Sequence, residues 1–156
     1  MGIRIRVFAP EDTDRVIELW QACDLIRPWN DPRADIARKL SVQPELFLVA
    51  EDGDPDPGLD PDGAAAASRV VGSVMAGYDG HRGWLYYLAS DPARRGEGIG
   101  RLLTAEAEAR LLAMGCPKVQ LMVRAENDAV IAFYDALGYE GNEVLVRGKR
   151  MIEDRG

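Results

Sequence analysis

The chain has 156 residues, of which 47% are hydrophobic and 29% are charged, and its formal net charge is −7 at pH 7. This balance is typical of a soluble domain with a core of its own, and we expect a single domain over 1–156. The acidic charge argues against a nucleic-acid partner, and no apolar run is long enough to cross a membrane.

The chain contains two cysteines, Cys23 and Cys116, which lie far apart in the sequence. Their spacing fits neither a metal site nor a disulfide scaffold, so no metal is expected. A reducing, cytoplasmic location is the natural interpretation of so few cysteines.

The first third of the chain predicts a strand, two helices and a second strand. Residues 3–8 alternate apolar and charged side chains, as a half-buried strand does. Acidic residues after Pro10 open a helix that places Val16, Trp20 and Cys23 on one face, and Asp31 before Pro32 opens another. The continuous apolar run at 46–50 then predicts a central strand.

Residues 52–69 are dense in Asp, Pro, Gly and Ala, and such a composition cannot form a core. We predict a flexible acidic loop there. Attraction of a basic partner is the functional alternative to a merely solvated loop.

The rest of the chain predicts strands and helices in alternation. Strands are expected at 70–78, 84–90 and 119–123, helices from about 99 to 115 and from about 126 to 138, and short closing strands at 144–146 and 150–152. The element order predicts an α/β (α+β) fold, with a mixed, mostly antiparallel central sheet of six to seven strands and helices on both faces.

A glycine-rich turn stands between the strand at 84–90 and the helix that follows it. Gly96, Gly98 and Gly100 alternate where the apolar stripe of the helix begins, so unpaired N–H groups meet the positive end of the helix dipole. This arrangement predicts an anion site. The third glycine comes one residue too early for a dinucleotide fingerprint, and Arg101 with Leu102 stands where a P-loop needs Lys and then Ser or Thr.

The segment Arg95-Gly-Glu-Gly-Ile-Gly100 matches the Arg/Gln-x-x-Gly-x-Gly/Ala signature of the GNAT superfamily of acetyl-coenzyme A dependent N-acetyltransferases. A second motif of that family, from Asn127 through Tyr134 to Tyr139, follows about thirty residues later. The chain therefore resembles the GNAT superfamily over essentially its whole length. Three shorter stretches, at 25–31, 77–83 and 148–154, resemble the bacterial YpeA-type acetyltransferases.

The resemblance implies acetyl-CoA as cosubstrate. The turn would hold the pyrophosphate, the strand before it would pair with the pantetheine arm, and Asn127 would bond the coenzyme or simply cap its helix. The residues that it assigns to the coenzyme are Leu88, Ala89, Ser90, Arg95, Gly96, Glu97, Gly98, Ile99, Gly100, Arg101 and Asn127. Arg94, beside Arg95, would add positive charge or serve as ordinary surface charge.

Tyr134 is the catalytic residue that the resemblance implies. When an amine attacks the thioester, a thiolate leaves, and a nearby phenol can return a proton to it. The alternative is a core tyrosine on the inner face of the helix. The motif match favours catalysis.

The general base stays open. Peptide N-terminal acetylases of the superfamily carry a glutamate where this chain has Met122, which puts that substrate in doubt. The candidates are Asp79, His81, Tyr86, Tyr87 or a water chain. Residues expected at the acceptor site are Trp29, Asn30, Tyr78, Asp79 and His81, with Arg27 near them.

These inferences together predict an acetyl-CoA-dependent N-acetyltransferase that acts on a primary amine of a small molecule or a protein. The alternative from another class is a non-catalytic acyl-CoA sensor of the same fold, and O-acetylation would change only the acceptor. The identity of the acceptor stays open. Dimers are common in the superfamily, and the sequence leaves a homodimer open.

Overall fold

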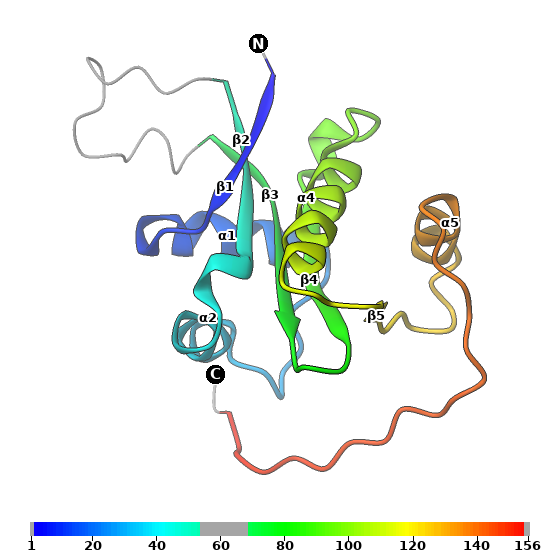
Figure 1. Cartoon of the computed structure of the whole chain (residues 1–156). Helices are drawn as coiled ribbons and strands as arrows, with labels where there is room; N and C mark the ends of the chain where they lie inside the picture. The colour runs from blue at the N-terminus through cyan, green and yellow to red at the C-terminus, as the bar shows by residue number, and fades with distance from the viewer. Residues whose placement is uncertain (1, 54–68, 155–156) are drawn as a thin grey trace.

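The computed structural model describes residues 2–53 and 69–154. Its centre is one five-stranded sheet in the order β1-β2-β3-β4-β5 (Figure 1). The strands are β1 (Ile3–Val7), β2 (Phe47–Asp52), β3 (Val70–Tyr78), β4 (Gly83–Ser90) and β5 (Val119–Leu121). Residues 54–68 of the predicted acidic loop lie outside the described residues.

Within residues 2–53 and 69–154, four helices and three short 3-10 turns connect and cover the strands. The helices are α1 (Thr13–Ala22), α2 (Pro32–Ser41), α4 (Ile99–Ala113) and α5 (Asp128–Ala136), and the 3-10 turns are η1 (Pro10–Asp12), η2 (Pro44–Leu46) and η3 (Pro92–Arg94). The predicted cap of α2 is present, because the Asp31 side chain accepts from the backbone N–H of Arg33 at 2.9 Å. Local signals therefore placed these helices well.

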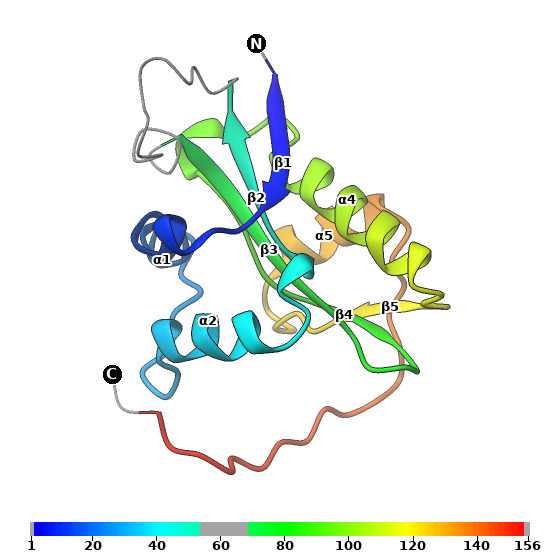
Figure 2. The same cartoon turned by 60° about the vertical axis from the view of Figure 1, so that its left-hand side comes forward.

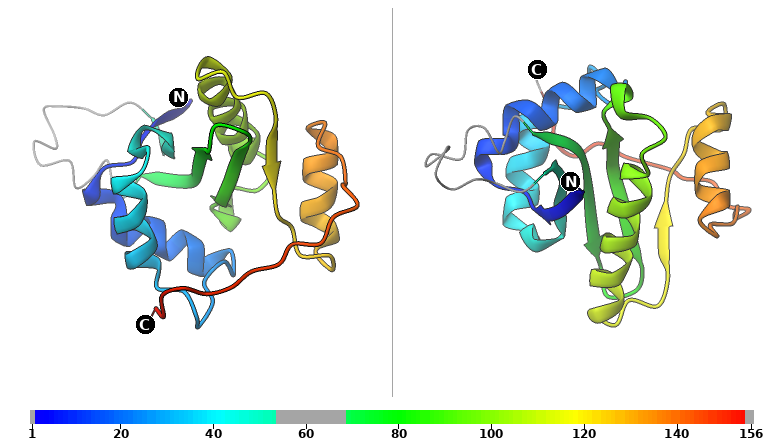
Figure 3. Two further views of the ribbon diagram at one scale, coloured as in Figure 1. Left: turned by 60° about the horizontal axis from the view of Figure 1, so that its bottom comes forward. Right: turned by 90° about the horizontal axis from the view of Figure 1, so that it is seen from above.

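The two faces of the sheet carry separate apolar clusters, as strand alternation requires. On one face Leu48 and Ala50 of β2 pack with α4, whose buried stripe is Ile99, Leu103, Ala107 and Leu111. On the other face Phe47 and Val49 pack with α1 and α2. Helices thus cover both faces, which confirms that part of the prediction (Figure 3).

The prediction of six to seven strands is wrong, because five strands form among the described residues. The residues at 144–146 and 150–152 make no strand, and Val144 and Leu145 are 71% and 89% exposed. From α5 this segment runs as an extended chain past the sheet towards α2 (Figure 2). Alternating apolar residues favour a strand only where a neighbouring strand accepts their backbone hydrogen bonds, and here they meet none.

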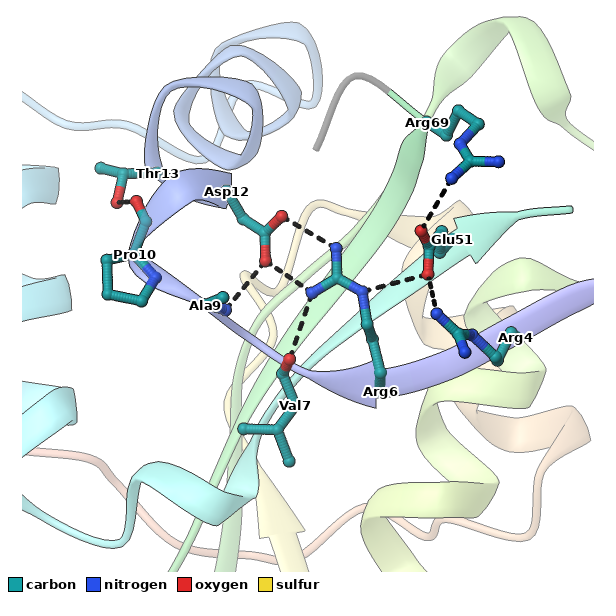
Figure 4. Close-up of polar contacts among 9 residues, drawn as sticks. All are labelled: Arg4, Arg6, Val7, Ala9, Pro10, Asp12, Thr13, Glu51 and Arg69. Carbon is teal, nitrogen blue, oxygen red and sulfur yellow. Dashed lines mark hydrogen bonds and ion pairs between the residues drawn. The ribbon is translucent and has the colours of Figure 1, made fainter. Parts of the chain in front are cut away.

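A buried network of ion pairs links the end of β2 to β1 and to the start of β3 (Figure 4). Glu51 is fully buried and forms ion pairs with Arg4 at 2.6 Å, Arg6 at 3.1 Å and Arg69 at 3.5 Å. Arg6 also binds both carboxylate oxygens of Asp12, at 2.7 and 2.9 Å. Because each buried carboxylate meets a guanidinium, the network holds β1, β2, β3 and the start of α1 together.

Candidate functional site

Strand β4 has an open edge beyond its first three residues. The pairs β1–β2, β2–β3 and β3–β4 are antiparallel, whereas β4 and β5 are parallel. The parallel pairing covers only Gly83 to Leu85, which lie opposite Val119 to Leu121. From Tyr86 to Ser90, therefore, β4 pairs with β3 alone among the described strands.

A β-bulge lies in β4 at the start of this open edge. Met75 is opposite Tyr86 and Ser73 is opposite Ala89, so Tyr87 and Leu88 together face one residue of β3. Tyr87 has a φ of +52°, a left-handed conformation that a residue with a side chain rarely adopts. A strain of this kind persists only where the surroundings impose it.

Contacts with three other elements hold Tyr87 in this conformation. Trp20 stacks on the Tyr87 ring with 3.9 Å between centroids, and its Nε1 donates to the Ser73 hydroxyl at 2.9 Å. Ser73 in turn donates to the Tyr87 carbonyl at 3.3 Å, and the Tyr87 hydroxyl donates to Asp35 of α2 at 2.6 Å. Burial and the Asp35 carboxylate raise the pKa of Tyr87, so this phenol keeps its proton and is a poor general base.

The backbone of Leu88 and Ser90 faces the open edge. The N–H of Asp91 donates to Val71 of β3 at 2.8 Å, and successive residues of a strand point their backbone groups to opposite sides. Ser90 and Leu88 therefore point away from β3. The thiol of Cys23 occupies one of these groups, since it donates to the Ser90 carbonyl at 3.2 Å.

The glycine turn has the backbone that the sequence predicts. Gly96 and Gly98 have φ angles of +86° and +76°, and an added β-carbon at either would meet no atom within 4 Å. These glycines are needed for their conformation rather than for space. Gly98 is also the N-cap of α4, and no side chain caps this helix, so its first N–H groups remain open to an anion.

The arginines of the turn differ in their surroundings. Arg94 is occupied by Glu97, at 2.5 and 2.8 Å, and by Asp52, at 2.8 Å. Arg95 and Arg101 are exposed and form no ion pair within the described part of the chain. The positive charge available to a ligand therefore comes from Arg95 and Arg101, not from Arg94.

Tyr134 lies on the inner face of α5 and is 8% exposed. Its ring makes edge contacts with Phe133 and Tyr139, and its hydroxyl has no hydrogen bond to the described residues. Burial raises the pKa of Tyr134 to about 12, so the phenol is neutral throughout the physiological range. Asn127 caps α5 by accepting from Val130 N–H at 3.3 Å, which is the structural role expected of it.

A cavity of about 760 Å³ lies between β5 and α5. Tyr134, Glu108, Leu121 and Met122 are among its lining residues, whereas the glycine turn is not. Tyr134 therefore borders a cavity that the glycine turn does not line.

The predicted acceptor residues fall into two groups at different places. Trp29 is 52% exposed and lines a hollow of about 540 Å³ together with Arg38 and residues 148–152. Beside it, Arg150 donates to the side-chain carbonyl of Asn30 at 2.7 Å. The C-terminal segment is fixed here by an ion pair of Asp154 with Arg38, which lowers the pKa of Asp154 to about 2.

The second group belongs to the hairpin between β3 and β4. Asp79 accepts from the backbone N–H groups of His81 and Arg82, at 2.8 and 2.7 Å, and these bonds lower its pKa. Tyr78 donates to backbone carbonyls of Gly80 and Gly115. The hairpin precedes Gly83, whereas the glycine turn follows Ser90, so the group lies at the other end of β4. Backbone N–H groups of its own turn engage the Asp79 carboxylate. Because Asp79 and His81 both lie at the end of β4 away from the glycine turn, neither is positioned to act there as a general base.

Sequence reasoning missed the residues that shape the bulge. Ser73, Trp20 and Asp35 lie in three different elements, and Asp35 meets Tyr87 across 52 positions of sequence. No local pattern marks such contacts.

Among the described residues no cluster of three or more His, Cys, Asp or Glu is arranged to hold a metal, and none of their helices has the length and apolarity of a membrane span.

Comparison with known proteins agrees with this architecture. Residues 13–139 match the family model described as the acetyltransferase (GNAT) family. An acetyltransferase of Sodalis glossinidius is 52% identical over 154 residues, covering 98% of this chain and 99% of its own length. One of Pectobacterium atrosepticum is 50% identical over 153 residues, covering 98% and 99%. The solved NatC complex, bound to Gag peptide and CoA, shares the fold, with a TM-score of 0.70 at 23% identity over 97% of this chain and 89% of that one.

The fold and the relatives define an enzyme of the acyltransferase class. Within that class, the chain belongs to the GNAT family and is an N-acetyltransferase. A sensor without catalytic activity is therefore not favoured.

Proposed function

We propose that this enzyme transfers the acetyl group of acetyl-CoA to a primary amine of a small molecule or a protein. The observation that carries the proposal is the alignment of an open strand edge with an uncapped helix N-terminus. The edge runs from Tyr86 to Ser90, and the turn at Gly96 to Gly100 follows it in the chain after η3. An extended pantetheine arm that ends in a pyrophosphate needs these two features in this order.

The coenzyme would be held mainly by backbone groups. Leu88 and Ser90 offer outward-facing N–H and C=O groups, with Ala89 buried between them, and the N–H groups from Gly96 to Arg101 receive the pyrophosphate. Arg95 and Arg101 add positive charge. Because Cys23 occupies the Ser90 carbonyl, the arm displaces this thiol or uses the Ser90 N–H instead.

Tyr134 would act as the general acid. Its phenol is neutral, nearly buried and without a partner among the described residues, so its proton is free for the leaving thiolate. Asn127 would steady the coenzyme near the start of α5 while it caps that helix.

The acceptor would enter beside Trp29 and Asn30. Arg38 of α2 lines the hollow next to Trp29, and Asp35 of the same helix accepts from the bulged Tyr87, so α2 links the hollow to β4. We leave Tyr78, Asp79 and His81 out of the acceptor site because they lie on the distant hairpin. Of the candidates for the general base, Tyr86, which is half-exposed at the start of the open edge, and an ordered water chain then remain.

Several further assignments belong to this proposal. We infer that the enzyme is of the YpeA type, forms a single domain over 1–156 and acts in the cytoplasm without a nucleic-acid partner. The match of residues 13–139 to one family model and the two clusters on one sheet support the single domain. A homodimer is compatible with the proposal.

The decisive experiment measures thiol release from acetyl-CoA against a panel of primary amines, alcohols and peptides, with acetyl-CoA binding measured separately. We expect tight binding and at least one amine that raises turnover above hydrolysis. Gly98→Asp, which puts a carboxylate on the turn, should abolish binding without unfolding the chain. Binding without any acceptor would favour the sensor, and turnover only with alcohols would make the enzyme an O-acetyltransferase.

A further inference from the structure

The glycine turn contains an acidic residue. Glu97 stands between Gly96 and Gly98, in the segment whose N–H groups face the proposed anion. A free carboxylate there would repel a pyrophosphate, since like charges a few ångströms apart destabilise each other. Helix N-termini attract negative charge, so Glu97 would also compete with the ligand for the dipole.

Arg94 forms an ion pair with Glu97 within the turn. Its guanidinium donates to both carboxylate oxygens of Glu97, through Nε at 2.5 Å and Nη2 at 2.8 Å. This bidentate geometry is the strong form of an arginine–carboxylate pair. It lowers the pKa of Glu97 and raises that of Arg94, so both remain charged and bound to each other.

Arg94 is itself anchored to the sheet. Its third nitrogen, Nη1, binds Asp52 at the end of β2 at 2.8 Å. The neighbouring Glu51 is the buried centre of the network that joins β1, β2 and β3, so the end of β2 is a rigid support. The guanidinium therefore holds the Glu97 side chain towards β2.

We propose that Arg94 is a positioning residue for the coenzyme, which neutralises Glu97 and keeps its carboxylate out of the pyrophosphate site rather than binding the pyrophosphate itself. The proposal rests on the proposed function. It predicts that the effect of losing Arg94 depends on Glu97.

The experiment is a double-mutant cycle read by coenzyme A binding. Arg94→Ala should weaken binding about tenfold because it leaves the Glu97 charge beside the anion. Arg94→Ala/Glu97→Ala should restore binding to within about threefold of wild type, since the turn keeps its backbone N–H groups. Pantetheine, which lacks the pyrophosphate, should bind Arg94→Ala as it binds wild type, and the loss for coenzyme A should shrink in high salt.

Other results would overturn the proposal. A double variant as weak as Arg94→Ala would show that Arg94 binds the anion directly. Equal losses for pantetheine and coenzyme A would point to a collapsed turn. Asp52→Asn keeps the pair with Glu97 and should cost little, so a loss as large as that of Arg94→Ala would mean that anchoring rather than neutralisation matters. Failure of wild type to bind coenzyme A would instead refute the proposed function.

Discussion

A β-carbon placed on Gly100 would lie 3.2 Å from Cζ of Phe133, so the first turn of α4 and the body of α5 are in direct contact. Gly100 belongs to the glycine turn, and Phe133 precedes Tyr134. The absence of a side chain at one position thus sets the distance between the proposed pyrophosphate site and the proposed acid.

Gly100→Val should therefore reduce turnover more than coenzyme binding. Its branched side chain would crowd the Phe133 ring, so we expect Phe133 and the adjacent Tyr134 to shift, whereas the N–H groups of the turn remain. We expect at least a tenfold loss in kcat. Gly141→Val is the control, because no atom lies within 4 Å of its added β-carbon. Full activity of Gly100→Val would show that the contact does not place Tyr134.

Tyr134→Phe should lower kcat about a hundredfold and leave coenzyme affinity nearly unchanged, as expected for loss of a general acid. Tyr139→Phe is the matched control, since this ring also packs on Tyr134 but its hydroxyl is committed to Glu108 at 2.7 Å. An active Tyr134→Phe enzyme would remove the acid from the mechanism.

The same substitution should alter the alkaline stability. Burial raises the pKa of Tyr134 from 10.0 to about 12 in the folded protein. The stability that the neutral, buried phenol provides is fully present below pH 10 and is lost as the pH rises through 12, amounting to about 3 kcal/mol. Urea unfolding at pH 9 and at pH 11.5 should show a smaller decline in Tyr134→Phe than in wild type. Equal declines would mean that Tyr134 is not buried in solution.

Ser73→Ala should destabilise the bulge of β4. It leaves the buried Nε1 of Trp20 without its acceptor and frees the Tyr87 carbonyl, at a cost of about 1–3 kcal/mol in the free energy of unfolding. Because the bulge shapes the open edge, turnover should fall as well. Ser41→Ala, on the exposed end of α2, should change neither quantity. A stable and fully active Ser73→Ala variant would contradict this role.

Glu51→Gln should be the most destabilising of these substitutions. It leaves Arg4, Arg6 and Arg69 gathered around a neutral amide at a fully buried position (Figure 4), and breaking such a network costs about 3–5 kcal/mol. Glu18→Gln, whose carboxylate is 65% exposed and pairs with Arg15, should cost less than about 0.5 kcal/mol. Denaturant midpoints of the two variants make the comparison, and similar values would argue that Glu51 is solvated.

The sequence predicted those features that arise from neighbouring residues. Alternation gave the strand found at Ile3–Val7, the Asp31–Pro32 pair gave the start of α2, and the spacing of Ile99, Leu103 and Ala107 gave the buried stripe of α4. The turn at Gly96 and Gly98 also follows from the sequence, because glycine adopts positive φ without strain. Periodicity, capping and backbone freedom operate within a few residues, so they can be read directly.

Tertiary structure alone decided the remaining features, because each depends on contacts between distant segments. The strands predicted at 144–146 and 150–152 have no partner, and the bulge falls at Tyr87 rather than at a glycine because Trp20, Ser73 and Asp35 hold it there. Arg94 pairs with Glu97 and with Asp52 of β2. The sequence alone thus determined the glycine turn where we propose that an anion binds, whereas only the fold decided that, among the described residues, Arg94 is paired there and Arg95 and Arg101 are not.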